Sequence, residues 1–215
     1  MTEDVAERWA RLRAEIPAHV RIVAVTKTQP AGAVARIVAA GASDIGENYV
    51  QEARAKFAEV PLSYTKHFIG HVQTNKAKAI AETFDVVQSV DRIEAGEALA
   101  KAASAAGKRL GVLVQLNISP SERFGVRAED APALARALRS LDSLSVDGVM
   151  AIGPLGAPPA EISRAFELAA AVFAAIGGTT LSLGMSGDWR EAVRAGSTMV
   201  RLGSVLFGPR PAARV

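Results

Sequence analysis

A single lysine ends the first apolar segment of the chain and is the residue with the clearest chemical potential. Segment 21–27 reads RIVAVTK, and its apolar and β-branched residues run without polar alternation, as in a parallel strand covered on both faces. Lys27 then stands at the carboxyl end of this strand, although lysine is among the side chains least often buried. Lys27 therefore either marks where the strand reaches the surface or carries chemistry, such as Schiff-base formation with a carbonyl compound.

Small residues and an arginine follow later apolar segments and predict a site for an anion. Ser186 and Gly187 precede a helix-like segment, and turns of this kind commonly hold phosphate groups. Gly203 and Ser204 follow the next apolar run, although Gly203 could simply relieve crowding at a rim. Arg201 shares strand parity with Gly203, so both are expected to face inward, where an unpaired arginine is costly.

Together these residues suggest a phosphorylated carbonyl compound held as a Schiff base. Pyridoxal 5′-phosphate (PLP) matches all three features, with its aldehyde on Lys27, its phosphate on the glycines and serines, and its pyridine nitrogen on Arg201. The residues alone do not separate this site from that of a sugar-phosphate aldolase, which would act without PLP.

The two histidines of the sequence HFIGH, His67 and His71, are expected to be structural or rim residues. A metal site needs a complete ligand set, and no third ligand is evident beside them. The chain has no cysteine, which excludes disulfides, thiolate catalysis and cysteine-ligated zinc. We therefore predict no metal site.

Eight apolar segments alternate with helical patterns and must position the candidate residues. The expected strands are 21–27, 43–48, 66–70, 86–90, 110–118, 146–152, 179–185 and 199–206. The expected helices are 30–41, 50–60, 74–84, 92–106, 129–143, 159–176 and 188–195. This alternation predicts parallel βα units and a single-domain (β/α)8 TIM barrel with its site at the carboxyl ends of the strands. The alternative is a doubly wound open sheet. We expect one domain over 1–215, with 1–20 as a leading helix on the barrel exterior.

The composition is that of an ordinary globular protein and excludes several classes of partner. Of 215 residues, 49% are hydrophobic and 22% are charged. The net charge is only +3 and aromatic residues make up 5%, whereas a nucleic-acid surface needs a basic stripe with stacking rings. No run approaches the roughly 18 apolar residues of a membrane span, and the charged N-terminal segment is unlike a secretory signal. We expect a cytoplasmic protein with no nucleic-acid or membrane partner.

Five motifs resemble the YggS/PROSC family of pyridoxal phosphate homeostasis proteins. They are AVTKTQP, IGENYVQEA, HFIGHVQTNK, LSLGMSGDW and GSTMVRLGSVLFG, in this order along the chain. The resemblance implies a barrel related to the N-terminal domain of alanine racemase, with Lys27 as the internal-aldimine lysine. It also implies that the PLP site includes Asn48, Met185, Ser186, Arg201, Gly203 and Ser204. The sequence departs from the family in HVQTNK, where leucine commonly precedes the glutamine, and in the loop GPLGAPPAE, which changes the expected shape of the rim.

The resemblance further implies a protein that holds PLP and acts in intracellular PLP (vitamin B6) homeostasis without robust catalysis. The expected partners are PLP, amino acids bound as external aldimines, and apo-enzymes that receive PLP, and the expected state is a monomer. The alternative is a PLP-dependent amino-acid racemase, which needs proton donors on both faces of the cofactor. Lys27 could serve one face. In alanine racemases a tyrosine of a second domain serves the other, and here the only tyrosines are Tyr49 and Tyr64.

Overall fold

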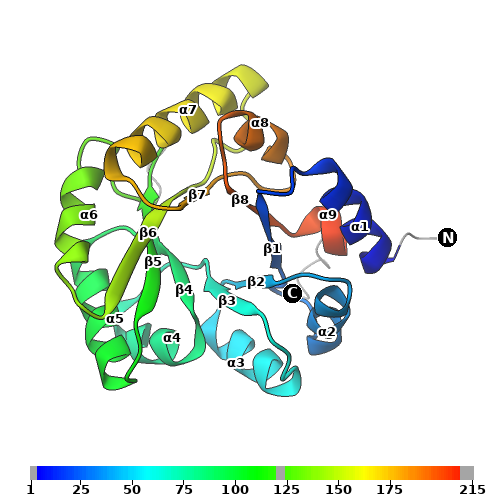
Figure 1. The fold of residues 1–215 in the computed structure, drawn as a ribbon, viewed down its shortest axis with the longest axis horizontal. Coiled ribbons are helices and arrows are strands. Elements are labelled where there is room, and N and C mark those ends of the chain that lie inside the picture. The colour runs from blue at the N-terminus through cyan, green and yellow to red at the C-terminus, as the bar shows by residue number, and fades with distance from the viewer. Residues whose placement is uncertain (1–3, 120–123, 209–215) are drawn as a thin grey trace, which may run out of the picture.

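Parallel strands close into a barrel in the computed structural model, which describes residues 4–119 and 124–208 (Figure 1). Within these residues eight strands follow one another around the ring in chain order, and β8 pairs back with β1. They are β1 (Arg21–Val25), β2 (Asp44–Glu47), β3 (Thr65–Phe68), β4 (Val86–Val90), β5 (Leu110–Leu116), β6 (Leu144–Ala151), β7 (Thr180–Ser182) and β8 (Met199–Leu202). The predicted TIM barrel is confirmed, and the open sheet is excluded.

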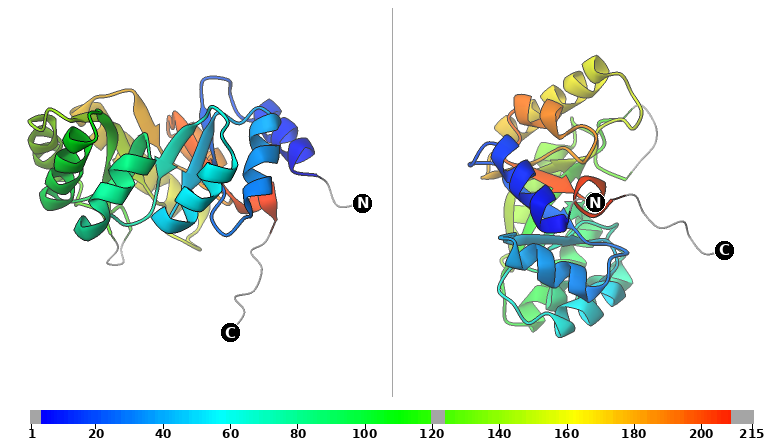
Figure 2. Two further views of the ribbon diagram at one scale, coloured as in Figure 1. Left: turned by 90° about the horizontal axis from the view of Figure 1, so that it is seen from below. Right: turned by 90° about the vertical axis from the view of Figure 1, so that its right-hand side faces the viewer.

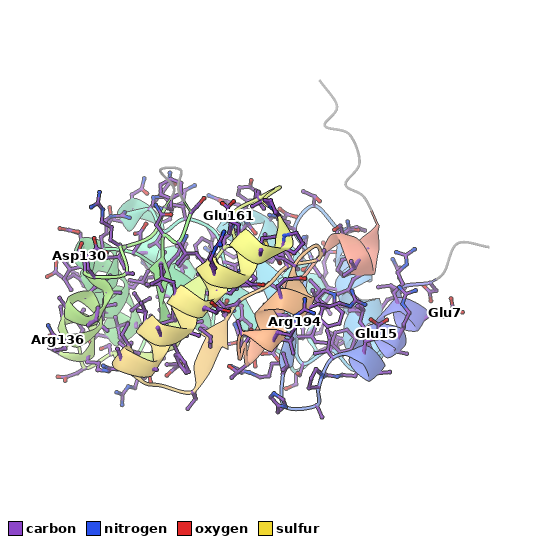
Figure 3. All side chains as sticks on the ribbon, turned by 90° about the horizontal axis from the view of Figure 1, so that it is seen from above. Glu7, Glu15, Asp130, Arg136, Glu161 and Arg194 are labelled. Carbon is purple, nitrogen blue, oxygen red and sulfur yellow. The ribbon has the colours of Figure 1, made fainter. Side chains whose placement is uncertain are left out.

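Helices surround the barrel on its outside, as Figures 1 and 2 show. They are α1 (Val5–Glu15), α2 (Ala31–Ala39), α3 (Val50–Glu59), η1 (Thr74–Lys76), α4 (Ala77–Thr83), α5 (Ile93–Ala105), α6 (Ala131–Arg139), α7 (Pro159–Ile176), α8 (Trp189–Arg194) and α9 (Ser204–Phe207). Their outer faces carry charged side chains, such as the exposed Arg136 and Arg194 (Figure 3). Their inner faces are apolar: Leu138 of α6 and Phe166 of α7 are fully buried, as the predicted stripes require.

The first helix packs on the barrel exterior beside α2 and α9 (Figure 1). Asp4 and Glu7 form a capping box that begins α1, which satisfies backbone N–H groups that have no partner within the helix. Trp9 and Leu12 of α1 then join an apolar cluster that includes Ile37 of α2. Burial of these side chains is what attaches the N-terminal segment to the rest of the fold.

The last strand is shorter than its sequence predicts. The prediction of a strand over 199–206 is wrong beyond Leu202, because Gly203 leaves the strand conformation with φ −122° and ψ −78°. The N–H groups of Leu206 and Phe207 then donate to the carbonyl oxygen of Gly203 at 2.9 Å each, which starts the short helix α9. The apolar run looks strand-like because both of its parts are buried, and periodicity does not distinguish a short buried helix from a strand. Within the described residues, no helix has the length and apolar character needed to cross a membrane.

Candidate functional site

A cavity of about 320 Å³ opens at the carboxyl ends of the strands, the end of a TIM barrel that carries its chemistry. It brings together every site residue predicted from the sequence: Lys27, Asn48, Met185, Ser186, Arg201, Gly203 and Ser204. Its other lining residues are Val25, Thr28, Gln29, Ile69, Met150, Ile152, Gly187, Phe207 and Gly208. The volume lies at the lower end of the range of about 300–1,000 Å³ for small-molecule sites.

Lys27 reaches this cavity from a turn that follows β1. The strand itself is buried from Ile22 to Val25, and Thr26 after it is fully buried. Lys27 is half-buried, because the chain leaves the barrel wall one residue before it. The strand therefore reaches the surface at Lys27, and the lysine side chain lines the cavity; its covalent chemistry stays a prediction.

Arg201 enters the cavity from β8 and is only 4% exposed. Its Nη1 donates to the carbonyl oxygen of Ser182 at 2.8 Å and to the Ser182 hydroxyl at 2.6 Å. Its Nη2 donates to the carbonyl oxygen of Ala151 at 2.8 Å. Burial lowers the pKa of Arg201 to about 10, and the nearby Asp188 carboxylate opposes that shift. The guanidinium therefore stays charged at neutral pH, and these bonds use at most three of its five N–H donors.

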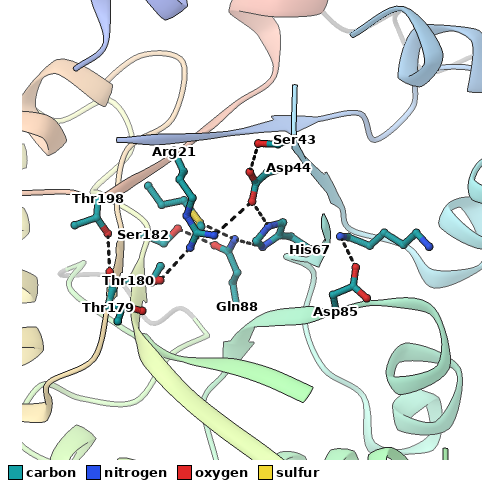
Figure 4. A network of polar contacts seen from close by, with 12 residues as sticks. Arg21, Ser43, Asp44, His67, Asp85, Gln88, Thr179, Thr180, Ser182 and Thr198 are labelled. Carbon is teal, nitrogen blue, oxygen red and sulfur yellow. Dashed lines mark hydrogen bonds and ion pairs between the residues drawn. The ribbon is translucent and has the colours of Figure 1, made fainter. Parts of the chain in front are cut away.

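A chain of hydrogen bonds continues from Ser182 across the interior of the barrel (Figure 4). The Ser182 hydroxyl accepts from Arg201, so its proton goes to Gln88 Oε1 at 2.7 Å. Gln88 then directs its amide nitrogen to Nδ1 of His67 at 3.0 Å, which leaves His67 Nε2–H to donate to Asp44 at 2.8 Å. Because arginine can only donate, every link has the same direction, from the guanidinium on β8 to a carboxylate on β2.

Asp44 ends this chain at a buried position. Burial alone would raise the pKa of the Asp44 carboxyl, but hydrogen bonds from His67 and Ser43 and the nearby Arg21 outweigh it, so the pKa lies below its usual range. The Arg21 guanidinium is 3.6 Å from Asp44 and half-exposed. The interior of the barrel thus carries the positive Arg201 at the cavity and the negative Asp44 at the other end of the hydrogen-bond chain.

The turns after β7 and β8 are bonded to each other. Gly184 has φ +88°, and a Cβ there would lie 2.6 Å from that of Ala192, so the turn requires glycine at this position. The Ser186 hydroxyl oxygen accepts from the N–H groups of Gly203 at 3.2 Å and Val205 at 3.3 Å. Its lone pairs are therefore used within the protein, and its proton remains available to donate to a ligand oxygen.

Asn48 follows β2 and offers an unsatisfied amide to the cavity. Its Oδ1 is buried and has no hydrogen-bond partner among the described residues, although the residue lines the cavity. Buried polar atoms are nearly always paired in folded proteins. The unpaired Asn48 oxygen can only accept a hydrogen bond, so a donor group of a ligand or a water molecule would satisfy it.

Sequence reasoning missed the apolar wall of the cavity and the role of one histidine. Ile69 and Ile152 line the cavity and each directly follows a strand, which is a signal that a search for polar residues passes over. His67 was predicted to be structural or at the rim; it is buried and forms part of the hydrogen-bond chain that begins at Arg201. His71 stacks on Phe124 with ring centroids 3.8 Å apart. Over 4–119 and 124–208, no His, Cys, Asp and Glu side chains form a metal-binding group.

Comparison with known sequences identifies full-length relatives. Residues 2–211 match the family described as alanine racemase, N-terminal domain. A pyridoxal phosphate homeostasis protein of Pseudomonas aeruginosa is 40% identical over 222 residues, which cover 98% of this chain and 96% of the relative. The protein of the same name from Escherichia coli is 38% identical over 230 residues, which cover 96% and 97% of the two chains.

Solved structures of other proteins have the same fold as this chain. PipY of Synechococcus elongatus, solved with PLP bound, superposes with a TM-score of 0.90 at 37% identity, and the match covers 95% of this chain and all of PipY. An alanine racemase of Clostridium difficile has a TM-score of 0.79 at 13% identity, with all of this chain matching 59% of the racemase. At that identity the racemase shows a common fold only.

The Asp44 end of the hydrogen-bond chain predicts a stability that depends on pH. Because the folded-state pKa of Asp44 is depressed, its contribution is fully present above the unfolded value of about 3.9 and is lost as the pH falls through the folded value. Asp44→Asn should lower the free energy of unfolding by about 1–2 kcal/mol at pH 7, and by less at pH 3. Urea unfolding at both pH values measures this, with exposed Asp142→Asn as the control. A deficit of equal size at both pH values would contradict the assignment.

Proposed function

This chain belongs to the YggS/PROSC family of pyridoxal phosphate homeostasis proteins, and on that premise we propose that its cavity binds PLP and that the protein acts in PLP homeostasis. The observation that carries the proposal is the meeting of Lys27, Arg201 and the turns of Ser186 and Gly203 in one cavity. Each group matches a different part of one molecule. The unpaired amide of Asn48 in the same cavity fits a polar ligand.

Lys27 holds the aldehyde carbon of the cofactor as a Schiff base. A lysine amine attacks an aldehyde only in its unprotonated form, and Lys27 lines the cavity at a half-buried position. Val25 and Ile69 provide part of the apolar wall of the cavity. The roles of the seven site residues remain our proposal, and Lys27 is the one on which covalent binding depends.

Ser186, Gly203 and Ser204 bind the phosphate. The Ser186 hydroxyl has its proton left to donate, because Gly203 and Val205 already occupy its oxygen. Ser204 begins α9, and its N–H, unlike those of Val205, Leu206 and Phe207, has no acceptor among the described residues. Donors of both kinds suit a phosphate oxygen, and bonds to a charged acceptor are about twice as strong as neutral ones.

Arg201 faces the pyridine nitrogen and keeps the protein a weak catalyst. PLP, when bound, supplies an electron sink for chemistry at the α-carbon of amino acids. That sink is strongest when a carboxylate partner keeps the pyridine nitrogen protonated. Arg201 has only donors, so the nitrogen opposite it acts as an acceptor and stays unprotonated.

The acid–base groups of the cavity also favour a carrier over a racemase. Among the described lining residues, Lys27 is the one side chain of a type that commonly serves as a general base. Tyr49 is 60% exposed and Tyr64 bonds to the carbonyl oxygen of Val60, and neither lines the cavity. Binding of amino acids as external aldimines, transfer of PLP to apo-enzymes, the monomeric state and the cytoplasmic location stay predictions.

Replacing the proposed covalent residue tests the function directly. Lys27→Ala should abolish the visible absorption band that PLP forms with the parent protein, because no amine remains to form the Schiff base. Borohydride reduction followed by peptide mass spectrometry should place the label on Lys27 in the parent. Lys78→Ala, whose side chain is 85% exposed, is the control and should leave the band intact. A band and a label that persist in Lys27→Ala would contradict the assignment.

The phosphate site predicts a large difference between two forms of the vitamin. Pyridoxal, which lacks phosphate, should bind about 100-fold more weakly than PLP or worse, since two charge-assisted hydrogen bonds of about 1.5–3 kcal/mol each are lost. Absorbance titrations give both affinities. Ser186→Ala should reduce the difference in affinity between PLP and pyridoxal, because it weakens only the binding of PLP. Equal affinities of the parent protein for the two forms would exclude this phosphate site.

The weak-catalyst assignment predicts slow exchange at the α-carbon of amino acids. Deuterium exchange of alanine and serine, followed by NMR, should proceed with the protein at a rate close to that with equimolar free PLP, because Arg201 leaves the electron sink weak. Exchange orders of magnitude faster, and lost in Lys27→Ala, would establish the racemase alternative instead.

A further inference from the structure

A buried charged cluster lies next to the turn that carries Lys27. Its centre is Lys56 of α3, whose side chain is 8% exposed. The Lys56 ammonium lies 2.7 Å from Glu47 Oε1, 2.6 Å from Glu52 Oε1 and 2.6 Å from the carbonyl oxygen of Thr26. Three acceptors thus match its three N–H donors. We call Lys56, Glu47 and Glu52 the Lys56 cluster.

The turn beside this cluster contains a strained residue. Thr28 has φ +66°, the one positive φ outside glycine among the described residues, and a β-branched residue in this region is an outlier. Such strain persists only where the surroundings enforce it, and it concentrates at functional sites. The N–H of Thr28 donates to Glu52 Oε1 at 2.6 Å, and the N–H of Gln29 donates to the carbonyl oxygen of Thr26 at 3.0 Å and closes the turn. Both bonds hold Thr28 in this conformation.

Both sides of Lys27 are therefore attached to the same cluster. Before it, the Thr26 carbonyl oxygen accepts from Lys56, and the Thr26 hydroxyl donates to Glu47 at 2.6 Å. After it, the Thr28 N–H donates to Glu52. The peptide groups that flank Lys27 are bonded to one ammonium and the carboxylates around it, while the lysine side chain itself extends to the cavity.

We propose that Glu52 and Lys56 are positioning residues that hold the turn 26–29 in its strained conformation, so that Lys27 presents its amine to the cavity. The inference rests on the proposed function, since it is the covalent role of Lys27 that gives the orientation a purpose. The Lys56 cluster has features that are expected to lower the stability of the fold. It buries a lysine, it carries one more negative than positive charge, and Glu47 Oε2 has no hydrogen-bond partner among the described residues. Features that oppose stability in this way are expected where function requires them.

The test measures how fast Lys27 reacts with PLP, using visible absorbance, borohydride trapping and peptide mass spectrometry. Glu52→Ala should slow labelling of Lys27 about tenfold, the factor that corresponds to the strain of one left-handed residue. Thr28→Gly in the same chain should recover most of this loss, because glycine adopts a positive φ without strain. Because Thr28 itself lines the cavity, Thr28→Gly alone supplies the reference rate for this comparison. Glu59→Ala, at an exposed position of α3, is the matched control.

A second readout does not depend on PLP. In the protein without the cofactor, the short bond to Glu52 should shift the Thr28 amide proton downfield in the NMR spectrum and protect it from exchange, and Glu52→Ala should abolish both effects. If circular dichroism and urea unfolding show that Glu52→Ala is not folded, Glu52→Gln replaces it. Labelling of Lys27 should then slow only about threefold, because a neutral acceptor remains.

The outcomes separate this inference from the proposed function. A parent protein whose Lys27 is not labelled overturns both. Normal labelling of the parent together with an unchanged rate in a folded Glu52 variant overturns the positioning role alone. A slower rate that Thr28→Gly does not restore also overturns it, because the loss would then arise from general damage and not from the turn.

Discussion

The interior of the barrel is organised by the need to bury one guanidinium without leaving it unpaired. Arg201 is almost inaccessible to water, and an isolated charge at such a position would be far too costly to keep. Because arginine offers donors only, each neighbour must accept from one side and donate onward on the other. Ser182, Gln88 and His67 each do so, and Asp44 ends the series with a carboxylate. One side chain on β8 thus constrains residues on five other strands when its bond to Ala151 of β6 is included.

This constraint divides the cavity into two mechanically different sides. Arg201 belongs to the barrel wall, where strand pairing and the hydrogen-bond chain fix its position, and groups on such rigid elements are held more precisely than groups on loops. Lys27 lies beyond the end of β1 and depends on contacts made by its turn. Under the proposed function, Arg201 fixes one end of the ligand and Lys27 binds it from a turn, which suits a protein that must both hold PLP and release it.

The sequence reveals the strand-end residues well and the contacts between elements poorly. Lys27, Ser186 and Gly203 were predictable because apolar runs locate strand ends, and the inward orientation of Arg201 followed from the period of two along a strand. The same logic does not find Lys56, which in an amphipathic helix looks like a solvent-facing residue until the contact with β2 is known. Nor does it find the partners of His67, since pairing across strands depends on register, and a shift of one residue reverses every side chain.

The closure of the barrel has a consequence for biosynthesis. Val23 of β1 pairs with Arg201 of β8, so the strand that precedes Lys27 has both of its neighbours only when β8 joins it. One side of the cavity follows β1 and the other belongs to β8. A nascent chain whose β8 is still inside the ribosome therefore lacks the side that carries Arg201. A ligand that contacts both Lys27 and Arg201 therefore binds only after β8 has joined β1. Under the proposed function, PLP that binds only the closed barrel stabilises it against unfolding by mass action.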